Sequence, residues 1–255
     1  MTLIRSIIMA LSMFTKIPMP RINWEKANMR YMFAAFPLIG LVNCAVLYGW
    51  FRLAEFLGFG TILYAAGLTL LPVFLTGGIH LDGFCDTIDA LSSHAAPERK
   101  REILKDPNAG AFAVIYLGVY LLAYFALCTE LERTPLSIIL LGGISVISRA
   151  AGAMSSVAFN SSKGGGLLDT FRDSASSVTV FICTFFIGAY SGWAGVGAVT
   201  YGNWSGVPAI IVTFACMIYV KIMSRRQFGG MSGDLAGFQI QLTELLALAA
   251  TVVVV

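Results

Sequence analysis

Long uncharged stretches recur along the chain, and short segments that carry the charges separate them. A helix that crosses a membrane needs about 20 predominantly apolar residues. Such stretches predict spanning helices at 31–51, 56–79, 109–129, 134–148 with a continuation past Arg149, 174–220 and 235–255. The stretch at 174–220 is long enough for two helices with a turn in its TYGNWSG segment. The pattern therefore predicts about seven transmembrane helices.

The composition supports this interpretation. Hydrophobic residues make up 57% of the 255 residues and charged residues only 12%, whereas soluble domains carry about 25% charged residues. A disordered chain, a nucleic-acid-binding domain and most cytosolic enzymes are thereby excluded, and the lipid bilayer is an expected partner. Because no internal repeat or linker stands out, we expect one all-α helix bundle over residues 1–255.

The basic residues predict how this bundle is oriented. When the segments between the expected spans are taken in turn, alternate segments hold 15 of the 17 Lys and Arg residues. Loops rich in Lys and Arg face the cytoplasm. We therefore expect a multi-pass membrane protein with a cytoplasmic or interfacial N-terminal segment at 1–28 and a cytoplasmic acidic motif and basic loop at 80–108.

The candidate chemistry is densest in TGGIHLDGFCDTIDAL, residues 76–91. Asp82, Asp86 and Asp89 are spaced i, i+4 and i+7, so they share one face of a helix, and His80 lies just before them. Three carboxylates on one stripe repel one another, and a hard divalent cation with oxygen ligands offsets that repulsion. Mg²⁺ completes its shell with water and substrate phosphates, so the motif predicts phosphoryl chemistry on a diphosphate at the cytoplasmic face.

Each of these residues also has a simpler interpretation. The acids could form a solvated helix start, which the helix dipole favours, and His80 could be a packing or hydrogen-bonding residue.

Four basic residues and a further acid lie in other segments of the same side. Arg101 and Lys105 belong to a basic amphipathic run that either meets phosphate or forms a solvated loop. Arg149 lies at or within the membrane, where an arginine requires a partner, and Lys163 precedes three glycines. Asp234 stands among the glycines of GGMSGDLAG, ten residues before an intramembrane acid, Glu244.

Four motifs in this chain resemble those of the cobalamin synthase family, also called adenosylcobinamide-GDP ribazoletransferases. They are FTKIPMP at 14–20, GGIHLDGFCDTIDAL at 77–91, ERKREILKDPNAGAFA at 98–113 and GGMSGDLAG at 229–237. They occur in the family's order and extend over nearly the whole chain. Ile240 and Gln241 stand where many members have an Asn-Glu pair, and Ala90 stands where members often have Gly.

The resemblance implies a Mg²⁺-dependent transferase embedded in the cytoplasmic (inner) membrane. Its substrates would be adenosylcobinamide-GDP and α-ribazole or α-ribazole 5′-phosphate, and its products adenosylcobalamin or its phosphate and GMP. The residues then suggest a mechanism. Mg²⁺ bound by Asp82, Asp86 and Asp89 would hold the diphosphate, and Asp89 or His80 would act as the general base.

The remaining residues would support these groups. Arg101, Lys105, Arg149 and Lys163 are candidate phosphate ligands, and Asp234 would complete a second metal site or orient the ribose. The oligomeric state stays open, and a homo-oligomer is compatible with the sequence.

Two other functions compete with this one. A lipid-headgroup enzyme of the CDP-alcohol phosphotransferase type also has spaced Asp residues, but its D-x-x-D-G-x-x-A-R pattern is not matched around Asp82. A transporter would place Arg149 and Glu244 along a cation path, yet transporter acids lie near the midplane of repeated halves. Here the acids gather near one membrane face.

Overall fold

The computed structural model describes residues 2–161 and 167–254, and within these ranges the chain is helical with no β-strand. The helices in chain order are α1 (Thr2–Phe14), α2 (Lys26–Met29), η1 (Phe33–Ala35), α3 (Phe36–Leu57), α4 (Thr61–Thr76), α5 (Ile79–Ser92), α6 (Pro97–Ile103), α7 (Ala111–Glu130), α8 (Pro135–Ala158), α9 (Leu167–Tyr201), α10 (Val207–Gln227) and α11 (Gly233–Val254). The predicted all-α class is confirmed.

Six helices of the described chain are long and apolar enough to cross a membrane, and a seventh span results if the bent pair α4 and α5 is counted as one. This agrees with the predicted number. The end of α3 differs from the prediction, because the helix continues past residue 51 to Leu57. Arg52 and Glu55 form an exposed ion pair on its last turns, with 3.5 Å between N and O. These charges lie on the surface of the helix and do not terminate it.

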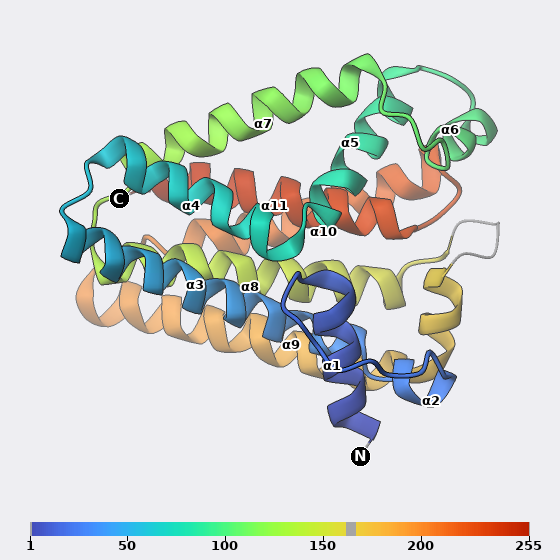
Figure 1. Ribbon diagram of the computed structural model, residues 1–255, viewed down its shortest axis with the longest axis horizontal. Helices are drawn as coiled ribbons and strands as arrows, with labels where there is room; N and C mark the ends of the chain where they lie inside the picture. Colours follow the sequence, from blue (N-terminus) through green and yellow to red (C-terminus); the bar gives the residue numbers. More distant parts are fainter. Residues whose placement is uncertain (1, 162–166, 255) are drawn as a thin grey trace.

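The long helices run roughly side by side, and α8 lies among them (Figure 1). It contacts α3, α9, α10 and α11, and 83% of its most apolar stretch is buried inside the protein. Thr134 begins this helix by accepting a hydrogen bond from the Ser137 N–H through its hydroxyl, with Pro135 in the first turn. The helix ends at Ala158, nine residues after Arg149, so the predicted continuation past Arg149 is confirmed.

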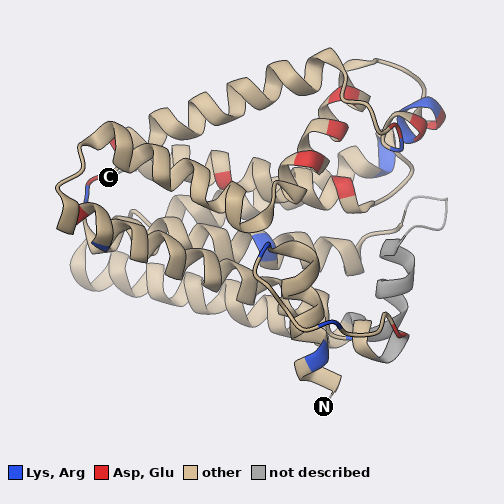
Figure 2. Cartoon of the chain, in the orientation of Figure 1, with Lys and Arg blue, Asp and Glu red and all other residues tan. Residues whose placement is uncertain are grey.

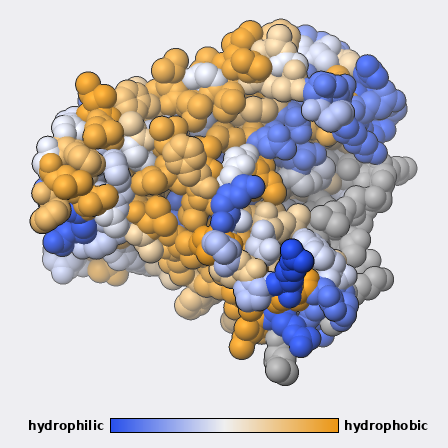
Figure 3. All heavy atoms as spheres, in the orientation of Figure 1, coloured by the Kyte–Doolittle hydropathy of each residue, from blue (hydrophilic) through white to orange (hydrophobic). Residues whose placement is uncertain are grey.

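The surface is that of a membrane protein. Large apolar side chains of the peripheral helices are exposed, among them Leu122 of α7 at 71%, Phe181 of α9 at 74% and Ile211 of α10 at 64%. Figure 2 shows most charged residues at the two ends of the bundle, and Figure 3 shows hydrophobic surface between them. An apolar belt of this extent is stable only against lipid.

A sharp bend follows α4, where a single straight span was expected at 56–79. Gly77 and Gly78 have φ angles of 64° and 79°, a left-handed backbone that glycine adopts without steric cost. The two helices that they join are bent by 93°, so α5 runs across the end of the bundle (Figure 1). This bend places the acidic motif beside α11.

Candidate active site

The acidic helix α5 and the start of α11 cross at two glycines. A Cβ atom added to Gly83 would lie 2.7 Å from the Asp234 carbonyl oxygen and 2.8 Å from its Cα. A Cβ atom added to Gly237 would lie 3.0 Å from the His80 carbonyl oxygen. The crossing therefore requires glycine at position 83 and leaves little space at Gly237, and it brings Asp234 beside α5.

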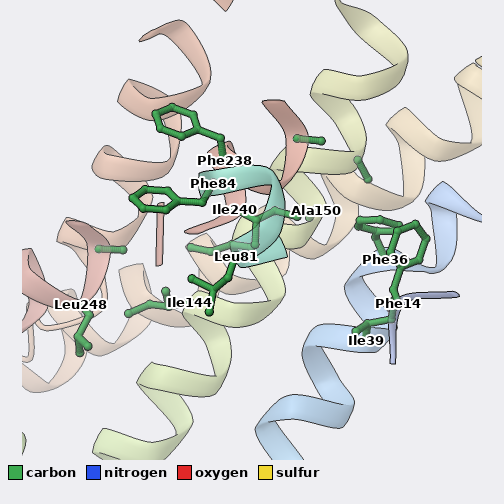
Figure 4. Close-up of a cluster of buried hydrophobic side chains, with 14 of the residues drawn as sticks. Phe14, Phe36, Ile39, Leu81, Phe84, Ile144, Ala150, Phe238, Ile240 and Leu248 are labelled. Atoms are coloured by element: carbon green, nitrogen blue, oxygen red, sulfur yellow. The ribbon is translucent and has the colours of Figure 1, made fainter. Parts of the chain in front are cut away.

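Figure 4 shows the apolar side of the same crossing. The Phe84 ring of α5 stacks on Phe238 of α11, with 5.7 Å between centroids and 13° between ring planes. Aromatic pairs of this kind contribute about 0.5–1.5 kcal/mol beyond their buried area. Leu81 and Ile240 pack in the same buried cluster, so apolar contacts fix the position of the acids.

Asp82, Asp86 and Asp234, which we call the carboxylate cluster, interact electrostatically. Asp86 is partly buried on α5 and lies within electrostatic range of Asp82, Asp234 and Asp89. Neither Asp82 nor Asp86 has an ion-pair partner among the described residues. The cluster is thus a site of uncompensated negative charge, as a cation-binding site requires.

Asp89 has a different environment from the other two acids of the stripe. Its carboxylate accepts hydrogen bonds from the backbone N–H groups of Gly110, at 2.5 Å, and Ala113, at 3.0 Å. These are unpaired donors at the start of α7, where a negative charge is also favoured by the helix dipole. The structure thus gives Asp89 a helix-capping role, while its predicted roles as metal ligand and general base stay predictions.

Replacing Asp89 by Ala distinguishes these roles. Because loss of a helix cap costs about 1 kcal/mol, we expect the free energy of unfolding to fall by about that amount while Mg²⁺-dependent turnover stays within about threefold. Unfolding in detergent and turnover measured on the same preparation test this. A loss of turnover as large as that of Asp82→Asn would instead support one of the predicted catalytic roles of Asp89, as metal ligand or general base.

Two cavities meet at Asp82. The larger, which we call the open groove, has a volume of about 850 Å³ and lies among α1, α4, α5 and α7; its polar lining includes Lys16, Asp82, Asp86 and Asp106. The smaller, which we call the inner cavity, has a volume of about 190 Å³ and lies among α1, α3, α5, α8 and α11. Asp82 is the one carboxylate in the lining of both cavities among the described residues.

Lys16 is a candidate functional residue that the sequence alone did not single out. Its backbone N–H donates to the Leu75 carbonyl oxygen at 2.7 Å, which ties the end of α1 to the end of α4. Its side chain lies over Gly77, where an added Cβ would be 3.0 Å from Nζ. The Lys16 ammonium group therefore lies at the bend that precedes the acids, in the open groove.

His80 lies in the first turn of α5 and lines the inner cavity. Its ring is 6.0 Å from Phe14 and 6.1 Å from Phe36, measured between centroids. The residue is buried, and its Nε2 has no hydrogen-bond partner among the described residues. A buried nitrogen of this kind needs a partner to offset its lost hydration. A ligand in the inner cavity would supply that partner, so the burial of His80 is compatible with a chemical role.

Two basic residues of α6 contact the end of α10. Lys100 donates to Oε1 of Gln227 at 2.6 Å, and Arg101 donates to the Phe228 carbonyl oxygen at 3.3 Å and pairs with Glu98. These contacts dock α6 on the end of α10. Lys105 is exposed, and Lys163 lies outside the described residues. The predicted phosphate contacts of these residues stay predictions.

Arg149 and Glu244, both predicted as unusual intramembrane charges, pair with each other. NH1 of Arg149 is 2.5 Å from Oε1 of Glu244, and both side chains are nearly inaccessible. The same carboxylate oxygen accepts hydrogen bonds from the hydroxyl groups of Ser145 and Ser148. The pair joins α8 to α11 inside the bundle. Arg149 thus has a structural role, whereas its predicted contact with phosphate stays a prediction.

Breaking this pair is expected to destabilise the protein. Removing one partner of a buried ion pair costs about 3–5 kcal/mol, whereas replacing both by apolar residues is often neutral. Arg149→Met should therefore lower the free energy of unfolding by that amount, and Arg149→Met with Glu244→Leu should recover most of it. A double variant as unstable as the sum of the single ones would contradict a pairwise role.

The cluster fits Mg²⁺ only together with a substrate. In the part of the chain that the structure describes, no three His, Cys, Asp or Glu side chains are arranged to hold a metal by themselves. Mg²⁺ is typically bound by one or two carboxylates, several waters and substrate phosphates. Asp82 and Asp86 supply oxygen donors of this kind beside the open groove.

Comparisons with known proteins identify relatives over the whole chain. The family model described as cobalamin-5-phosphate synthase matches residues 6–252. An adenosylcobinamide-GDP ribazoletransferase of Lachnoclostridium phytofermentans is 39% identical over 98% of this chain and 94% of its own length. Relatives with the same name from Clostridium botulinum and Clostridium perfringens are 30% and 32% identical, over 96% and 94% of this chain and the same shares of their own lengths.

No solved structure matches the fold. The family match covers both helices of the crossing, with the glycines and acids described above. From this match and from the full-length relatives, we conclude that the chain belongs to the cobalamin-5-phosphate synthase family.

Proposed function

We propose that this protein is an adenosylcobinamide-GDP ribazoletransferase, which joins adenosylcobinamide-GDP to α-ribazole or its 5′-phosphate and releases GMP. Family membership and the names of the full-length relatives support this activity. The observation that carries it is the carboxylate cluster at the crossing of α5 and α11. Asp82 and Asp86 of this cluster lie beside a groove of about 850 Å³, which is large enough for the guanosine diphosphate part of the donor.

In this reaction a hydroxyl oxygen of the acceptor ribose attacks the phosphorus next to cobinamide. The new P–O bond replaces the bond to the GMP phosphate oxygen, and the hydroxyl loses its proton. Mg²⁺, when bound, would neutralise charge on the diphosphate and on the leaving GMP. Asp82 and Asp86 would hold it, since carboxylate oxygens are its preferred protein ligands.

Lys16 would bind a phosphate oxygen of the donor in the open groove. Its ammonium group lies in the open groove with Asp82 and Asp86, and an ammonium ion stabilises negative charge that develops on phosphate oxygens. Lys16→Met should accordingly lower kcat/KM for the donor at least about tenfold. Steady-state kinetics with the donor varied at saturating acceptor test this.

His80 is the general base that we assign. The proton must pass to a group within hydrogen-bond reach of the hydroxyl, and His80 lines the inner cavity beside Asp82 with its Nε2 unpartnered. The capping contacts of Asp89 with α7 disfavour the alternative base.

The site would face the cytoplasm. The ends of α3, α7 and α9 meet at one end of the bundle, near Arg52 and Arg133, whereas the carboxylate cluster lies at the other end with most of the Lys and Arg residues (Figure 2). By the positive-inside rule the latter end is cytoplasmic. This orientation supports a location in the cytoplasmic membrane, where both soluble substrates would reach the groove directly.

The activity is tested with detergent-solubilised protein, adenosylcobinamide-GDP, α-ribazole and Mg²⁺. Chromatography should show GMP and adenosylcobalamin in equal amounts, and EDTA should abolish both. If GMP or CMP were released only from other nucleotide-diphosphate donors with a lipid or alcohol acceptor, the protein would be a headgroup transferase and the proposal would be wrong.

A further inference from the structure

Both aromatic and acidic side chains line the inner cavity. Its apolar lining includes Met13, Phe14, Phe33 and Phe36, and its polar lining consists of His80, Asp82, Ser156 and Asp234 among the described residues. The three phenylalanines contact one another, with centroids 4.4 Å apart for Phe14 and Phe36 and 5.4 Å apart for Phe33 and Phe36. A ligand that matches this cavity is flat and aromatic at one end and carries hydrogen-bond donors at the other.

We propose that the inner cavity is the acceptor subsite, in which a neutral bicyclic aromatic base packs among the phenylalanines while the ribose hydroxyls face Asp82 and Asp234. This inference deepens the proposed function and rests on it. Carboxylates accept hydrogen bonds from hydroxyl groups, and offset or edge contacts between aromatic rings are favourable.

Size and charge separate this subsite from the donor site. Pockets for drug-sized ligands measure about 300–1,000 Å³, so 190 Å³ suits a ring system, whereas the open groove of about 850 Å³ suits a larger molecule. Both cavities have acidic lining residues, but the open groove also has the Lys16 ammonium group, whereas the part of the inner cavity that the structure describes has no Lys or Arg in its lining. A diphosphate is therefore favoured in the groove.

The shared position of Asp82 then determines how the substrates meet. Because Asp82 lines both cavities, an acceptor in one and a donor in the other present their reacting groups at the same carboxylate. The transfer is thus direct, within a complex that holds both substrates. Initial-rate plots at varied donor and acceptor should intersect, and parallel lines with release of GMP before acceptor binding would overturn this arrangement.

Benzimidazole, a neutral bicyclic base, serves as the probe for the subsite. It should bind the purified protein in equilibrium dialysis without any substrate, and it should inhibit competitively with α-ribazole but not with the donor. Competition with the donor alone, or no binding at concentrations well above the KM for α-ribazole, would overturn the assignment.

Two variants with matched controls locate the binding. Phe33→Leu should raise both the dissociation constant of benzimidazole and the KM for α-ribazole about tenfold, the scale of one base–aromatic contact, with the donor KM within twofold. Phe51→Leu, the same change at a buried ring that lines neither cavity, should alter neither value. Equal effects of both variants would mean a general loss of packing and would contradict the subsite.

The second variant narrows the cavity without removing a core side chain. Gly233 lines the inner cavity, and a Cβ atom added there meets no atom within 4 Å. Gly233→Leu should weaken benzimidazole binding at least tenfold, whereas Gly188→Leu, at an open position on α9, should not. If the wild-type protein bound benzimidazole but did not transfer ribazole, the proposed function would be wrong and the subsite would stand. If the wild-type protein transferred ribazole but Gly233→Leu bound benzimidazole as tightly as the wild type, the subsite would be wrong and the proposed function would stand.

Discussion

Replacing Asp82 by Asn is expected to lower turnover about a thousandfold while the protein stays folded. The change keeps the size of the side chain and removes the charge that would hold the cation against the diphosphate. Loss of one electrostatic contact to a transition state typically costs a factor of about 10²–10³, and Asp82 also lines the cavity assigned to the acceptor. GMP release per protein, measured at saturating Mg²⁺, gives this factor directly.

Glu102→Gln is the matched control for this variant. Glu102 lies on α6 at the same end of the bundle, is exposed and pairs only with Arg99 among the described residues, so the same loss of one negative charge should leave turnover within twofold. The two variants should also share the wild-type elution volume in detergent. Full activity of Asp82→Asn would remove the carboxylate cluster from the mechanism.

Adding one methyl group at the helix crossing is expected to have the second largest effect. The Cβ of Gly83→Ala would lie 2.7–2.8 Å from backbone atoms of Asp234, so α5 or α11 must move. A displacement of about 1 Å at a reacting centre can cost a factor of about 10². We therefore expect turnover to fall about a hundredfold, although neither a charge nor a substrate contact has been removed.

Gly118→Ala provides the comparison. Gly118 lies on α7, where an added Cβ meets no atom within 4 Å, and the change even favours the helix by about 1 kcal/mol. Turnover of this variant should equal that of the wild type. If Gly83→Ala were equally active, the close approach of α5 and α11 would not be what positions Asp234.

Much of this site could be predicted from the sequence, because its local patterns have direct physical meaning. The i, i+4, i+7 spacing placed Asp82 and Asp86 on one helix face, and charge-free stretches located the long helices. Arg149 and Glu244 were each recognised as costly inside a membrane. That they would pair with each other could not be predicted, since the contact joins residues 95 positions apart.

The differences between the predicted site and the observed site arise from contacts between segments that are distant in the sequence. Asp89 has the same spacing as its neighbours, yet it caps α7 because the 93° bend brings α5 to Gly110. Lys16 belongs to the FTKIPMP motif, but nothing in that motif predicts contact with the acids. Its backbone bond to Leu75 is what brings it beside them. The two-glycine sequence at 77–78 signals a turn, but the direction of that turn depends on how α5 packs against α11.

Binding of Mn²⁺ tests the central claim, that the carboxylate cluster holds the catalytic cation with the diphosphate. Mn²⁺ shares the preference of Mg²⁺ for oxygen ligands and is detected by electron paramagnetic resonance. With adenosylcobinamide-GDP present, the wild-type protein should bind Mn²⁺ in a form that Mg²⁺ displaces, and Asp82→Asn and Asp86→Asn should bind it at least tenfold more weakly. Unchanged Mn²⁺ binding in both variants would contradict the account.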